Sequence, residues 1–153
     1  MDYKKALSTG LPIENLNISV KWNINKDALL SMFDHAETRE NREYNYWGCH
    51  IKAKVLGIDE ANVTFNFVKN KMTSVSISGH LMAASENLVE NYEMLQNHLE
   101  SILGKPNNLS KIFFNIFNSK GEKSFCWKFG KITIKHSLFE RFGLQEYLEI
   151  LIK

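Results

Sequence analysis

Three segments in the first half of the chain alternate between apolar and polar residues and follow one another closely. They run over residues 46–56, 62–68 and 72–79, and a short turn at 69–71 joins the last two. A period of two is typical of strands with one buried face. Strands with such short connections pair antiparallel, because a parallel crossover needs about a dozen residues or more. The sequence therefore predicts an antiparallel sheet.

A long helix is predicted next. The segment ENLVENYEMLQNHLESIL, residues 86–103, follows Ser85, a good N-cap, and ends at Gly104 before Lys105-Pro106. A shorter helix is predicted at 26–36, with Asn25 as its N-cap. Residues 38–45 read as a solvated loop. Further strands are predicted at 16–24, 111–117, 124–129, 131–138 and 145–152.

These elements fit one domain. A chain of 153 residues is long enough to bury a single core, and no linker rich in Pro, Gly or Ser divides it. We therefore predict one α+β domain over residues 1–153. Its curved antiparallel sheet has about six to eight strands, and the two helices pack on one face of it.

Cys49 and His50 place a thiol beside an imidazole, which raises the question of catalysis. Neighbours in a strand point to opposite faces, so adjacency in sequence tends to keep a nucleophile away from its base. Cys126 falls on the polar side of its own strand and is left as a possible spatial neighbour of His50. Metal-ligand spacings such as HxxxH or CxxC are absent from the sequence, as are phosphate-binding loops. We expect a protein that is not an enzyme, with no catalytic residue, metal or cofactor.

The most distinctive predicted surface lies on the long helix, opposite its apolar residues at ~100° per residue. No Lys or Arg occurs between Ser85 and Leu103 to balance the carboxylates on this face. An acidic stripe of this kind suits a basic partner, although a solvated helix face would have the same composition. The stripe consists of Glu86, Glu90, Glu93, Asn97 and Glu100.

A second surface has the opposite charge. If the aromatic residues of the strands face the core, lysines collect on the outer face of the sheet and at its turns. They are Lys52, Lys54, Lys128, Lys131 and Lys135. Lysines that neutralise phosphates suit a nucleic acid, but the aromatic residues that would stack on bases belong to the buried side. A lysine-rich open face also protects a sheet against aggregation.

The strand KIFFNIF, residues 111–117, is unusual because both of its faces are apolar. If Ile112, Phe114 and Ile116 face the core, Phe113 and Phe117 face outward. They would then be covered by another part of the chain or by a second copy. Monomer and dimer both remain open.

The segment ENYEMLQNHLESILGKP, followed by the strand FCWKFGKITIK, resembles small bacterial α+β immunity proteins of contact-dependent and other polymorphic toxin systems. The resemblance covers roughly the last seventy residues and includes no diagnostic motif. It implies a cytoplasmic, non-catalytic protein that binds a toxin domain and blocks its active site. It implies no particular functional residue, because these proteins are diverse.

The acidic stripe is compatible with such a role, since a nuclease toxin would have a basic cleft. The partner expected is therefore a protein with a basic surface. A nucleic-acid-binding module on the lysine face and a small-ligand-binding domain are the alternatives. No segment approaches the ~18 apolar residues of a membrane span, so no membrane association is expected.

Overall fold

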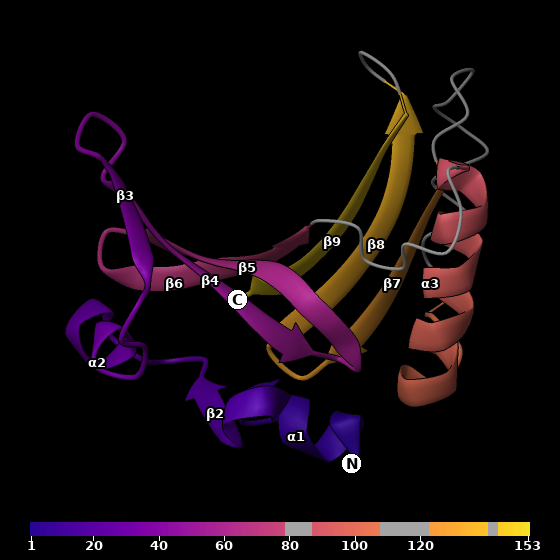
Figure 1. Cartoon of the computed structure of the whole chain (residues 1–153), viewed down its shortest axis with the longest axis horizontal. Helices are drawn as coiled ribbons and strands as arrows, with labels where there is room; N and C mark the ends of the chain where they lie inside the picture. Colours follow the sequence, from indigo (N-terminus) through magenta and orange to yellow (C-terminus); the bar gives the residue numbers. More distant parts are fainter. Residues whose placement is uncertain (79–86, 108–122, 141–143) are drawn as a thin grey trace.

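The computed structural model describes residues 1–78, 87–107, 123–140 and 144–153 (Figure 1). Within these residues a seven-stranded antiparallel sheet, in the order β3-β4-β5-β6-β9-β8-β7, forms the centre of the fold. Its strands are β3 (Glu37–Asn41), β4 (Tyr46–Val55), β5 (Ile58–Val68), β6 (Lys71–Ser78), β7 (Lys123–Phe129), β8 (Ile132–Glu140) and β9 (Leu144–Ile152). A separate antiparallel pair is formed by β1 (Gly10–Ile13) and β2 (Ile18–Lys21). The predicted α+β class and the antiparallel sheet are confirmed.

The core lies on one face of the large sheet. Residues that are directly opposite each other on paired strands share a face, and the register aligns a buried row that runs from β4 to β7. The row consists of Cys49, Phe65, Val75, Ile150, Ile134 and Trp127. The aromatic alternation therefore points inward, as the sequence predicts.

The helices are α1 (Tyr3–Leu7), α2 (Lys26–Leu30) and α3 (Leu88–Leu103), and a 3-10 turn, η1 (Glu14–Leu16), separates β1 from β2. In Figure 1 the sheet bends into a trough, and the helices and the β1–β2 pair lie on its convex side. The Phe33 ring, just beyond α2, stacks on Phe65 with the centroids 6.1 Å apart. At the end of α3, Trp127 Nε1 donates to the carbonyl oxygen of Gly104 at 2.7 Å. Both predicted helices thus pack on the same face.

The N-terminal region differs from the prediction. The strand predicted at 16–24 is divided: Leu16 ends η1, Asn17 has a left-handed φ of 53°, and β2 begins only at Ile18. The preceding strand, β1, was not predicted, because all four of its residues are buried and it shows no alternation. The helix predicted at 26–36 ends at Leu30, after which the chain makes tighter turns that bring Phe33 onto the sheet.

The loop predicted at 38–45 is wrong in part, because β3 occupies residues 37–41 and pairs with β4. All five residues of β3 are exposed, so the strand has no buried face to produce an apolar pattern. The strand predicted at 111–117, with Phe113 and Phe117, lies outside the described residues.

Candidate functional site

The outward face of α3 carries the predicted acidic stripe. The helix begins at Leu88, and Asn87 is its N-cap, with Oδ1 accepting from the amide of Val89 at 3.0 Å. The predicted cap Ser85 and the first stripe residue Glu86 lie outside the described residues. Packing of one side of the helix onto the sheet leaves the other side to solvent. The buried side consists of Tyr92, Leu95, Gln96, Leu99 and Leu103.

Three members of the stripe, Glu90, Glu93 and Asn97, are exposed. Glu100 is only half-buried, and its Oε1 accepts a hydrogen bond from Gln96 Nε2 at 2.8 Å. Among the described residues, the exposed part of the stripe is therefore Glu90, Glu93 and Asn97, and Glu90 and Glu93 supply its charge. We call Glu90, Glu93 and Asn97 the α3 face.

A buried polar network lies beneath α3. The His136 side chain is fully buried, with Nδ1 2.9 Å from Gln96 Oε1 and Nε2 2.9 Å from Glu146 Oε1. The Tyr92 ring stacks on the imidazole with the centroids 4.2 Å apart. Burial, together with the charge of Glu146, raises the pKa of the Tyr92 hydroxyl. Among the described residues, that hydroxyl is a buried polar group without a hydrogen-bond partner.

Both nitrogens of His136 face oxygen atoms that accept hydrogen bonds. Gln96 donates to Glu100 through Nε2, which fixes Oε1 as the amide atom turned toward the ring. This geometry suits a protonated ring that donates from both nitrogens and pairs with the Glu146 carboxylate. The sequence gives no indication of this network, since its members come from α3, β8 and β9.

The structure does not bring the five predicted lysines together. Lys52 and Lys54 lie on β4, whereas Lys128 and Lys135 lie on β7 and β8, with three strands between the two groups. Lys131 lies in the turn between β7 and β8.

Acidic residues interrupt the same face. Lys54 Nζ is 2.9 Å from Asp59 Oδ1, and this contact raises the pKa of the lysine. Lys135 lies directly opposite Glu149 on β9. The outer face is thus a mixed polar surface with lysines at its two sides.

The Cys49–His50 pair does not form a catalytic site. Cys49 is fully buried in the core, and burial raises the pKa of its thiol from 9.0 to about 11, so the thiolate is disfavoured at neutral pH. His50 points to the other face of the sheet, where Nδ1 lies 3.1 Å from Thr64 Oγ1.

Cys126 is not a neighbour of His50 either. Both residues lie in one row across the outer face, but Thr64, Ser76, Glu149 and Lys135 separate them. At about 4.8 Å per strand, the two side chains are too far apart for contact.

An open groove of about 480 Å³ lies next to His50, at the place where β4 extends beyond the start of β3. Its apolar lining consists of Leu16, Met32, Phe33 and Ile51, and its polar lining of Asp34, His35, Glu37, His50 and Lys52. The volume is in the range of small-molecule sites, roughly 300 to 1,000 Å³.

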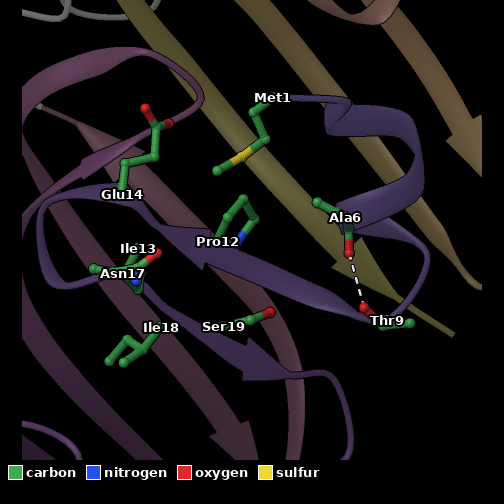
Figure 2. Close-up of a pocket in the computed structure, with 9 residues that line it drawn as sticks. All are labelled: Met1, Ala6, Thr9, Pro12, Ile13, Glu14, Asn17, Ile18 and Ser19. Carbon is green, nitrogen blue, oxygen red and sulfur yellow. Dashed lines mark hydrogen bonds between the residues drawn. The ribbon is translucent and has the colours of Figure 1, made fainter.

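A smaller groove of about 310 Å³ lies at the N-terminus (Figure 2). Met1, Pro12 and Glu14 contribute to its lining, and Thr9 Oγ1 donates to the carbonyl oxygen of Ala6 at 3.0 Å. The Glu14 carboxylate is already used: Oε1 accepts from the Tyr3 hydroxyl at 2.9 Å and from the amide of Gly57 at 2.7 Å. Glu14 therefore joins α1 to the β4–β5 turn.

In the described part of the chain, no group of three or more His, Cys, Asp or Glu side chains is placed to hold a metal ion. None of the helices described there has the length and apolar character needed to cross a bilayer.

Comparison with known proteins gives no assignment, since no family model, no curated protein and no solved structure matches the chain.

Proposed function

We propose that the protein is a non-catalytic inhibitor that acts in the cytoplasm and binds a protein partner through the α3 face. The supporting observation is that Glu90 and Glu93 are exposed on a helix that contains no Lys or Arg. Such a surface attracts a basic partner and speeds its association. The partner proposed is a bacterial toxin domain whose basic cleft is blocked by the helix, which is the role of an immunity protein.

The hydrogen bonds that fix α3 to the sheet support this proposal. Gln96 hydrogen-bonds to His136 on the inward side, and Trp127 holds the Gly104 carbonyl at the end of the helix. A helix fixed at two points loses little conformational entropy when a partner binds it. The α3 face is therefore a preorganised surface.

The test begins with affinity capture of the tagged protein from the lysate of its native cells, at low and moderate salt. One stoichiometric polypeptide should be recovered, and the wild-type protein should inhibit its activity. The double variant Glu90→Gln/Glu93→Gln should then associate about tenfold more slowly, because charge steering is lost.

The matched control is Glu43→Gln/Glu60→Gln, which removes two exposed carboxylates outside α3. It should associate at the wild-type rate. Equal association rates for the α3 variant and the wild type would remove the α3 face from the interface.

Binding of a small ligand in the groove beside His50 is the second candidate, and the apolar residues in the lining of that groove favour it. Occupancy would shift the imidazole NMR resonances of His35 and His50. Unchanged resonances across a library of small amphipathic ligands would refute this candidate. The nucleic-acid alternative has less support, because the lysines lie at two sides of the sheet and acidic residues interrupt them.

A further inference from the structure

The two edges of the large sheet differ in how their backbone groups are used. At β7, the amide of Asn107 donates to the carbonyl of Cys126 at 2.8 Å, and Asn107 Oδ1 accepts from the amide of Lys128 at 2.9 Å. The segment after α3 thus covers this edge. At β3, no backbone hydrogen bond to the outer edge occurs within the described residues. An open edge strand is a template for pairing with another chain.

The register identifies which groups of β3 point outward. The amide of Lys69 donates to the carbonyl of Asn45 at 3.2 Å, so odd-numbered residues direct their backbone groups toward β5 and the even-numbered residues of β4 direct theirs toward β3. Two of these even-numbered residues, His50 and Gly48, pair with Glu37 and Arg39 of β3. The backbone groups of Thr38 therefore point away from β4, toward the open edge.

The side chains of β3 are complementary to those of a second copy of β3. If two copies of β3 pair antiparallel about a two-fold axis at Thr38, each Thr38 exchanges backbone hydrogen bonds with its counterpart. Glu37 of each copy then lies opposite Arg39 of the other. Directly opposite positions share a face, so both pairs form on the outer side of the joined sheet. Neither side chain has an ion pair within the described residues.

The neighbouring registers are less favourable. If the two-fold axis lies at Arg39 and not at Thr38, residues whose numbers add to 78 face each other. Arg39 of one copy then lies opposite Arg39 of the other. If the axis lies at Glu40, Glu40 of one copy lies opposite Glu40 of the other. Like charges that face each other across strands are destabilising. Charge complementarity thus favours the Thr38 register.

We propose that β3 is the interface of a symmetric homodimer in which two sheets join through the Thr38 register into one continuous sheet. The occupant of this edge is a second copy of the chain. In Figure 1, β3 and α3 lie at opposite sides of the molecule, so the dimer leaves both α3 faces accessible. The dimer is independent of the function proposed above, but it would make that surface bivalent.

The interface is small, since β3 has five residues. Interfaces below about 1,200 Å² are weak and transient, and we expect a dissociation constant on the order of micromolar. The test is sedimentation velocity at protein concentrations that span this range. The wild type should change from monomer to dimer with rising concentration, and a wild type that stays monomeric throughout would overturn the proposal.

Charge exchange tests the register. Glu37→Arg alone places arginine opposite arginine, and Arg39→Glu alone places glutamate opposite glutamate, so each variant should be monomeric. An equimolar mixture of the two should form a heterodimer, and the double variant Glu37→Arg/Arg39→Glu should regain the homodimer. If Glu37→Arg dimerises as the wild type does, the register is wrong.

The control is Glu60→Arg, which makes the same charge change at an exposed position outside β3 and should dimerise normally. Circular dichroism confirms that each variant is folded. Hydrogen exchange then identifies the interface, because the Thr38 amide should become protected as the dimer forms. A dimer that leaves this amide unprotected would also refute the proposal.

Discussion

His136 is fully buried beneath α3, with both ring nitrogens bonded to oxygen atoms of other elements. Its contacts tie three parts of the fold together, since Gln96 belongs to α3 and Glu146 to β9. A buried charge is tolerated only when a counter-charge and hydrogen bonds replace water. A protonated His136 therefore needs the Glu146 carboxylate as its counter-charge.

At the scale of this residue pair, we predict that Glu146→Gln lowers the free energy of unfolding by about 3 to 5 kcal/mol, because the imidazolium loses its buried counter-charge. Urea denaturation at neutral pH measures the loss. The double variant His136→Phe/Glu146→Leu removes both charges and keeps the ring stacked on Tyr92, so it should recover much of the stability. A Glu146→Gln protein as stable as the wild type would show that the pair is not ionised.

At the scale of elements, α2 is a short helix that begins at a single N-cap side chain. Asn25 Oδ1 accepts from the amide of Ala28 at 2.9 Å, as expected for an N-cap. Because α2 has only five residues, its cap is a large part of its stabilisation. Its position matters to the core, since it leads into the turn that places Phe33 on Phe65.

We predict that Asn25→Ala lowers the free energy of unfolding by about 1 kcal/mol. The matched control is Asn23→Ala, two residues earlier at an exposed position, which should stay within about 0.5 kcal/mol of the wild type. Equal effects from the two substitutions in urea denaturation would contradict the capping role.

The strands that the sequence predicts correctly are those with one buried face. Alternation and short turns predict β4, β5 and β6 because each of them has a core side and a polar side. The fully buried β1 and the fully exposed β3 lack that contrast. The physical cause of both errors is that periodicity reports a difference between faces and not the strand itself.

The candidate site also has a part that the sequence predicts and parts that it does not. The α3 face was predictable, because the helical period separates its exposed carboxylates from its buried residues. The network of His136, Gln96 and Glu146 was not, because His136 and Gln96 are 40 positions apart in sequence and meet only when β8 is placed beside α3. The groove beside His50 likewise needs the position of η1 relative to β4.

At the scale of the whole molecule, the order of strands in the sheet differs from their order in the chain. The last strand, β9, lies between β6 and β8, so it joins the strands that precede α3 to those that follow it. Ile150 of β9 is fully buried and lies opposite both Val75 on β6 and Ile134 on β8. The part before α3 and the part after it therefore share one buried row and should not unfold independently.

We predict that Ile150→Ala lowers the free energy of unfolding by about 2 to 5 kcal/mol and destabilises both parts of the sheet equally, because it leaves a cavity at their junction. Trp47 reports on the β3–β6 part and Trp127 on the β7–β8 part, so the fluorescence of each can be isolated in variants that replace the other tryptophans by phenylalanine. Both signals should move to the same lower urea concentration and coincide with the loss of circular dichroism, as cooperative unfolding requires. If the Trp127 transition moved while the Trp47 transition stayed in place, the two parts would be separate folding units and β9 would belong to only one of them.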